Sequence, residues 1–147
     1  MSKWVEHFTD IARLKAGKSK DTNTKVGAVI FDELNGVEIS SGWNDLARGI
    51  VHTLERNTAP LKYKLTSHAE ISAITNAARM GRATLGHSLV VTMFPCSLCC
   101  AALINSGVTK VYSPKPDFDH VKYGEDMKLS VQMFKEAGVF VCHVQEN

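Results

Sequence analysis

The chain has 147 residues, of which 44% are hydrophobic and 22% are charged, and its formal net charge is +2. These values are typical of a globular protein, and we expect residues 1–147 to form a single domain with its own core. No apolar run has membrane length and no secretory signal is visible, so we expect no membrane partner. Four cysteines favour the reducing cytoplasm over a disulfide-bonded scaffold. Lysine and arginine are scattered along the chain, and a nucleic-acid partner is therefore not expected.

The first half of the chain predicts a helix, a β-hairpin and a long loop. Apolar residues recur at helical spacing as far as Gly17, and Ser2 is placed to cap this helix. The apolar residues that we expect in the core are Trp4, Phe8, Ile11, Ala12 and Leu14. The continuous apolar run at 26–31 predicts a strand buried on both faces, and residues 37–42 return as its hairpin partner. Residues 44–67 are polar and irregular, and a loop of that length is commonly functional.

The second half alternates helices with strands. The predicted elements are a helix from His68 to Gly81, a strand at 87–94, a helix from Cys96 to Gly107, a strand at 110–112, a helix ending at Gly138 and a strand at 139–144. Strand–helix–strand connections imply parallel pairing and right-handed crossovers. The predicted fold class is therefore α/β: a three-layer αβα sandwich around a mixed five-stranded sheet, in which strands 3–5 are parallel.

Two short motifs carry the chemistry, His-Ala-Glu at 68–70 and Pro-Cys-Ser-Leu-Cys at 95–99. The two cysteines are three residues apart, so their thiols face the same way at the start of a helix. A structural zinc site is normally closed by four protein ligands, whereas three ligands leave a position open for water. The predicted Zn²⁺ ligands are His68, Cys96 and Cys99, and the predicted catalytic proton carrier is Glu70.

A purely structural zinc site is the alternative for these residues. Cys100 could in principle serve as a fourth ligand and close the site. Adjacent residues on a helix point about 100° apart, however, so we expect Cys100 to face the core. Cys142 lies in an apolar run and is also expected to be a core thiol. The full motif set therefore favours a catalytic metal.

The order of the two motifs resembles that of the zinc-dependent cytidine deaminase superfamily. Within it, the chain is similar to the deoxycytidylate deaminases of bacteria and phages over nearly its whole length. The segment from Ser19 to Ala28 looks like the one that leads into that family's first strand. Ser41-Gly42-Trp43-Asn44 resembles its G-Y-N-G element. The zinc motifs specify only the superfamily, and these two segments carry the narrower resemblance.

The resemblance implies zinc-dependent deamination of dCMP to dUMP and ammonia, which would feed thymidylate synthesis. Lys25 is the expected contact to the 5′-phosphate and Asn44 the expected contact to the sugar. The backbone N–H of Ala69 is expected to hold the pyrimidine O2, and the backbone carbonyl of Phe94 to accept from the amino group. Further substrate contacts are expected from Ser19, Thr24 and Tyr123.

The resemblance also implies assembly and regulation. Relatives of this kind form homohexamers, so a homo-oligomer is expected. Many of them bind dCTP as activator and dTTP as inhibitor, with Mg²⁺, near the loop that follows the second strand. Asp45 places a negative charge where such an anionic effector would approach, which predicts altered regulation in this chain.

Three other functions stay open. One is a small-molecule deaminase acting on cytidine, cytosine or guanine, which recognition of a phosphate would separate from a dCMP enzyme. A second is a nucleic-acid base deaminase similar to the tRNA adenosine enzymes, against which the scattered basic residues argue. The third is an inactive, zinc-stabilised binding module, and the presence of Glu70 argues against it.

Overall fold

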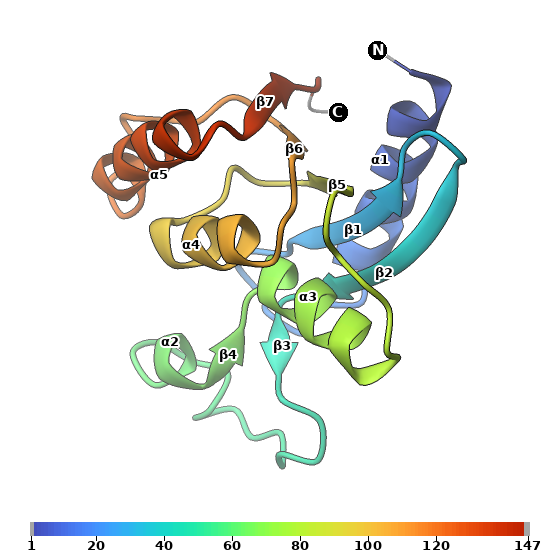
Figure 1. The fold of residues 1–147 in the computed structure, drawn as a ribbon. Coiled ribbons are helices and arrows are strands. Elements are labelled where there is room, and N and C mark those ends of the chain that lie inside the picture. Colours follow the sequence, from blue (N-terminus) through green and yellow to red (C-terminus); the bar gives the residue numbers. More distant parts are fainter. Residues whose placement is uncertain (1, 146–147) are drawn as a thin grey trace.

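The computed structural model describes residues 2–145, and at its centre lies a five-stranded sheet in the order β2-β1-β5-β6-β7 (Figure 1). The strands are β1 (Gly27–Asp32), β2 (Val37–Trp43), β5 (Ser88–Val91), β6 (Lys110–Ser113) and β7 (Phe140–His143). Strand β1 pairs antiparallel with β2 and β5, whereas β5, β6 and β7 run parallel. The predicted mixed sheet, with its last three strands parallel, is confirmed.

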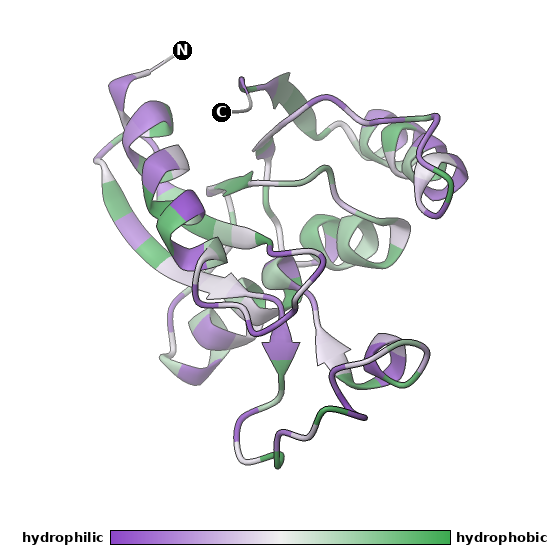
Figure 2. Cartoon of the chain, turned by 180° about the vertical axis from the view of Figure 1, so that it is seen from behind, coloured by the Kyte–Doolittle hydropathy of each residue, from purple (hydrophilic) through white to green (hydrophobic). Residues whose placement is uncertain are grey.

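Helices cover both faces of the sheet. The helices are α1 (Lys3–Ala16) on one face, and α3 (Ala69–Arg79), α4 (Ser97–Asn105) and α5 (Gly124–Ala137) on the other. Because side chains alternate along a strand, Ala28 and Ile30 pack with α3, α4 and α5, while Val29 and Phe31 pack with α1. Figure 2 shows α4 as mostly apolar, whereas apolar and polar residues alternate along β2. The two cores explain why β1 is apolar on both faces.

Helix α1 departs from the prediction at two residues. The hydroxyl of Ser2 donates to the carboxylate of Glu33 at 3.1 Å, and it makes no capping bond to the helix. Leu14 was expected in the core, but it is 74% exposed. It lies two positions beyond the buried Ala12, about 200° around the helix, and so points to solvent.

The long segment after β2 contains structure that the sequence did not predict. Two short strands, β3 (Asp45–Leu46) and β4 (Thr66–Ser67), pair antiparallel, and α2 (Lys62–Leu65) directly precedes β4. This pairing closes the segment on itself below the main sheet in Figure 1. As a result, α2 is held beside the start of α3. No helix within residues 2–145 is both long and apolar enough to span a bilayer.

Candidate active site

The two chemical motifs lie at the N-terminal ends of neighbouring helices. His68 is the residue before α3, and Cys96 is the residue before α4. Both have an extended backbone, with φ and ψ of −69° and 156° at His68 and of −71° and 168° at Cys96. Each motif thus meets the positive end of a helix, where free N–H groups favour thiolates and bound anions.

Three metal-binding atoms converge at this point. Nδ1 of His68 lies 3.5 Å from Sγ of Cys96 and 3.4 Å from Sγ of Cys99, and the three donor atoms lie within 4.8 Å of one another. Bond lengths of about 2.3 Å to sulfur and about 2.0 Å to nitrogen place the donors of a tetrahedral zinc ion roughly 3.5 to 3.8 Å apart. One imidazole and two thiolates are also ligands that zinc prefers. The cluster therefore fits Zn²⁺.

The thiols of Cys96 and Cys99 influence each other's pKa. A hydrogen bond from Cys99 lowers the pKa of Cys96 to about 4, and the same bond raises the pKa of Cys99. The lowered pKa favours the thiolate form of Cys96, which is the form that binds a metal.

Cys100 takes no part in this cluster. Its side chain is fully buried, and its Sγ lies 3.5 Å from the backbone carbonyl of Ser130 on α5. Burial raises the pKa of the Cys100 thiol to about 12, so it stays protonated in the core. The expectation that Cys100 faces the core is confirmed. A four-ligand site that includes Cys100 is not formed.

Glu70 lies on the first turn of α3, next to the cluster, and is only 4% exposed. Burial raises the pKa of its carboxyl group to about 7. A group with such a pKa can both accept and donate a proton near neutral pH. This is the property that a proton carrier in a hydrolytic site needs.

A cavity of about 200 Å³ connects this cluster with the surface. Its lining includes His68, Glu70 and Cys96 together with the apolar side chains of Met93 and Phe94. The rest of the lining comes mainly from three separate segments: residues 21–26, α2 with its neighbours, and the loop before α5. The cavity thus brings reactive groups together with polar and charged side chains.

Residues 2–114 match the family model described as the cytidine and deoxycytidylate deaminase zinc-binding region. The match spans both motifs and most of the chain. This chain belongs to the cytidine and deoxycytidylate deaminase family.

Individual relatives agree with this assignment. A deaminase of the luxG 3′ region of Aliivibrio fischeri, described as uncharacterized, is 38% identical over 142 residues, covering 96% of this chain and 93% of that protein. The deoxycytidylate deaminase of Mus musculus is 32% identical over 144 residues, covering 92% and 76%. The fold is shared with the dCMP deaminase of cyanophage S-TIM5, crystallised with dCMP and dUMP, which has a TM-score of 0.78 at 24% identity, covering 98% of this chain and 99% of that one. The resemblance inferred from the sequence is confirmed.

The residues that the family resemblance suggested for substrate binding fall into two groups. Thr24, Asn44, Ala69, Phe94 and Tyr123 line the cavity. Lys25 does not: it is exposed and lines a neighbouring hollow. Ser19 is buried, and its hydroxyl donates to the backbone carbonyl of Asn44 at 2.8 Å. Their substrate contacts stay predictions.

Asn44 joins two segments of the cavity lining through its side chain. Its side-chain carbonyl accepts from the N–H of Val26, and its amide group donates to the carbonyl of Thr24, both at 2.8 Å. These bonds fix the end of β2 against the segment that leads into β1. Any contact from Asn44 to a sugar would use the hydrogen-bonding capacity that remains after these two bonds.

Two lysines in the cavity wall were missed by the sequence analysis. Lys62 on α2 is 5% exposed and forms an ion pair with Asp21 at 3.2 Å. Lys122, in the loop before α5, has its Nζ 2.9 Å from the ring centroid of Tyr63 and 5.1 Å from that of Tyr123. Within residues 2–145, no carboxylate forms an ion pair with Lys122. Lys122 is therefore a cation of the cavity whose charge is not neutralised by a neighbouring acid.

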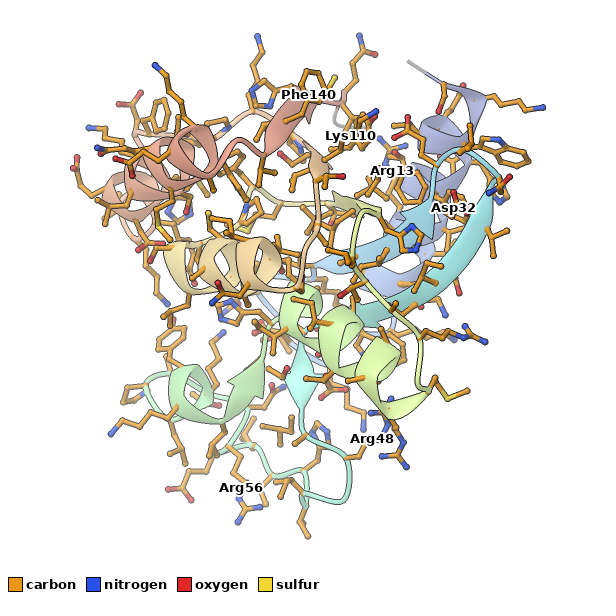
Figure 3. The ribbon with its side chains drawn as sticks, in the orientation of Figure 1. Arg13, Asp32, Arg48, Arg56, Lys110 and Phe140 are labelled. Atoms are coloured by element: carbon orange, nitrogen blue, oxygen red, sulfur yellow. The ribbon has the colours of Figure 1, made fainter. Side chains whose placement is uncertain are left out.

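Several other cations of the chain do not line the cavity. Figure 3 labels four of them, Arg13, Arg48, Arg56 and Lys110, and none is among the residues of the cavity wall. Arg48 donates to Asn76 on α3 at 2.6 Å, and Arg13 donates to the carbonyl of Gln145 at 2.7 Å. These contacts indicate structural roles for both arginines.

Replacing Lys62 by methionine is expected to destabilise the fold by about 3–5 kcal/mol, because the charged Asp21 would stay buried without its partner. Burial alone would raise the pKa of Asp21, but hydrogen bonds from the N–H groups of Asn23 and Thr24 and from Lys62 outweigh it and hold the pKa below the ordinary value. Urea denaturation measures the loss. The double variant Asp21→Asn/Lys62→Met should recover much of it, and Lys64→Met, on the exposed side of α2, should change stability by less than about 0.5 kcal/mol.

A loss below about 1 kcal/mol in Lys62→Met would contradict this account of the ion pair, because that is the scale of a solvent-exposed pair.

Proposed function

We propose that this family member catalyses the hydrolytic deamination of dCMP to dUMP and ammonia, which supplies dUMP for thymidylate synthesis. The observation that carries the proposal is a cavity whose lining includes His68 and Cys96 of the three-residue cluster, Glu70, and Lys122, which no carboxylate of residues 2–145 neutralises. The mouse relative named as a deoxycytidylate deaminase and the phage enzyme crystallised with dCMP and dUMP support it.

Each residue has a defined task in this reaction. Zinc held by His68, Cys96 and Cys99 would act as a Lewis acid that makes water a better nucleophile. Glu70 takes a proton from the water and delivers it to N3 of cytosine while the water oxygen bonds to C4. Glu70 then passes the second proton to the amino nitrogen, the C4–N bond breaks, and ammonia leaves.

The walls of the cavity hold the base for this chemistry. The N–H of Ala69 is the first of α3, and it is suited to donate to the pyrimidine O2. Phe94 is 4% exposed and contacts Phe134 edge to face, with ring centroids 6.3 Å apart. This packing keeps its backbone in place, so that its carbonyl can accept from the amino group of cytosine.

Recognition of the 5′-phosphate is the part of the proposal that sets the substrate class. Lys62 contributes little net charge, because Asp21 neutralises it. Lys122 lies beside the rings of Tyr63 and Tyr123 and has no ion-pair partner within residues 2–145, and a phosphate would give it a stronger partner than a ring does. We therefore assign the phosphate contact to Lys122, with Tyr123 beside it. The alternative is that Lys25, in the neighbouring hollow, contacts the phosphate.

The experiment compares kcat/KM for dCMP, deoxycytidine, CMP and a short single-stranded DNA by following ammonia release. We expect dCMP to be the preferred substrate. Lys122→Gln should lower kcat/KM for dCMP about 10- to 100-fold, the effect of losing one charged hydrogen bond, and leave deoxycytidine unaffected. Lys25→Gln is the matched control and should leave both values near wild type.

Two outcomes would count against these assignments. Equal or better turnover of deoxycytidine or DNA by the wild-type enzyme would reject dCMP as the substrate. A selective loss in Lys25→Gln, with Lys122→Gln unaffected, would instead place the phosphate in the neighbouring hollow.

Assembly, regulation and location extend the proposal. By family resemblance we propose a homohexamer in the cytoplasm and effector binding by dCTP or dTTP with Mg²⁺. Asp45, which we expect to oppose an anionic effector, lies 3.1 Å from Nε2 of His52.

A further inference from the structure

The helix that carries both cysteine ligands is capped by a side chain from another helix. Cys96 occupies the N-cap position of α4, but its own side chain makes no capping bond. Instead, Oδ2 of Asp126 accepts the N–H of Ser97 at 2.7 Å, and Oδ1 accepts the hydroxyl of Ser97 at 2.6 Å. Both distances are those of strong, charge-assisted hydrogen bonds. Asp126 comes from the first turn of α5, 29 residues further along the chain.

The two bonds to Asp126 can affect the metal ligands because Ser97 lies between them in the sequence. It directly follows Cys96 and comes two residues before Cys99. A bidentate bond to its N–H and hydroxyl fixes the peptide that joins Ser97 to Cys96. This peptide sets the direction of the Cys96 side chain and the start of the helical turn that brings Cys99 beside it. The negative charge of Asp126 also stabilises the positive end of α4.

Helix α5 is itself held firmly, so Asp126 has little freedom. Gly124 is buried at its start, and a Cβ there would clash with the backbone carbonyl of Phe118. Met127 and Phe134 anchor the helix in the core, where they are 3% and 1% exposed. No lysine, arginine or histidine within residues 2–145 forms an ion pair with Asp126. Its hydrogen bonds as an acceptor therefore go to Ser97.

We propose that Asp126 is a positioning residue for the metal centre, which holds Cys96 and Cys99 in the arrangement that binds Zn²⁺ through its two bonds to Ser97. Partners of this kind, which orient ligands without touching the metal, commonly contribute 10- to 100-fold, in order of magnitude, to metal affinity. The role concerns the binding of zinc itself and does not depend on which base the enzyme deaminates.

A simpler role for the same contact makes a different prediction. If Asp126 only stabilises the packing of α5 against α4, its loss should lower the stability of the zinc-free and zinc-loaded protein equally. The affinity for zinc should then stay unchanged. If Asp126 preorganises the ligands, its loss should weaken zinc binding and reduce the stabilisation that zinc provides.

The test measures the zinc dissociation constant by competition with a chromophoric chelator, together with Tm of the zinc-free and zinc-loaded protein. Asp126→Ala is expected to weaken zinc binding about 10- to 100-fold. Asp126→Asn keeps the shape and one acceptor oxygen, so it should fold if the alanine variant does not, and it should lose a smaller part of the affinity. Ser97→Ala keeps the N–H bond and should also lose only part.

Glu125→Gln is the matched control, because Glu125 is the neighbouring acid on the same turn, is exposed and, within residues 2–145, forms an ion pair with Lys128 alone, at 2.9 Å. It should leave the zinc dissociation constant unchanged. An unchanged zinc dissociation constant in Asp126→Asn and Asp126→Ala, with Tm lowered equally with and without zinc, would overturn the proposal.

Discussion

Cys99→Ala is expected to abolish stoichiometric zinc binding and, with it, deaminase activity. Cys99 is 1% exposed and supplies one of the three donors of the cluster found among residues 2–145, so its loss leaves two of the three predicted ligands. Metal binding also contributes to folding, because the assembled site does not exist in the unfolded chain. The variant should therefore lose the rise in Tm that zinc gives the wild type. Elemental analysis of the purified protein and thermal unfolding with and without added zinc measure the two effects.

Cys100→Ala is the control for this experiment, since the adjacent thiol is fully buried but points away from the metal cluster. We expect it to cost about 1 kcal/mol of stability through lost packing and to retain one zinc ion per chain. Stoichiometric zinc in Cys99→Ala, or loss of zinc in Cys100→Ala, would show that the ligand set is wrong.

Glu70→Gln is expected to lower kcat about 10²- to 10⁴-fold, the range that general acid–base catalysis contributes, while zinc content and fold are retained. The amide has the shape of the carboxyl group but can neither take the proton of the water nor return it to the leaving amino group. The buried carboxyl group already pays a desolvation cost, so its replacement should leave Tm unchanged or raise it. Steady-state kinetics with dCMP, together with zinc analysis of the same sample, distinguishes lost chemistry from lost metal. A kcat within about threefold of wild type would exclude Glu70 as the proton carrier.

The cluster of His68, Cys96 and Cys99 could be predicted from the sequence because its residues lie in two short motifs with fixed local geometry. The three-residue spacing of Cys96 and Cys99 places both thiols on one side of a helix start, and the same geometry directs Cys100 inward. The sheet could be predicted for a similar reason, since a buried strand such as β1 is a continuous apolar run. In both cases the signal lies within a few consecutive residues.

The two lysines of the cavity could not be predicted in this way. Lys62 lies in the four-residue helix α2 and Lys122 in the loop before α5, 60 residues further along, and both line one cavity only because of the tertiary fold. Strands β3 and β4 have two residues each, which is too short for a periodic pattern. The bond from Asp126 to Ser97 joins two helices, and no local pattern in either helix marks it. Contacts of this kind depend on tertiary packing.

The most direct test of the proposed chemistry is the deamination of dCMP by the zinc-loaded enzyme in ¹⁸O-labelled water, with the product analysed by mass spectrometry. Hydrolysis at C4 predicts dUMP that carries one ¹⁸O atom on the base, with one ammonia released for each dUMP formed. Absence of dUMP, or dUMP without the label from its first appearance, would contradict the account of a zinc-dependent hydrolytic dCMP deaminase.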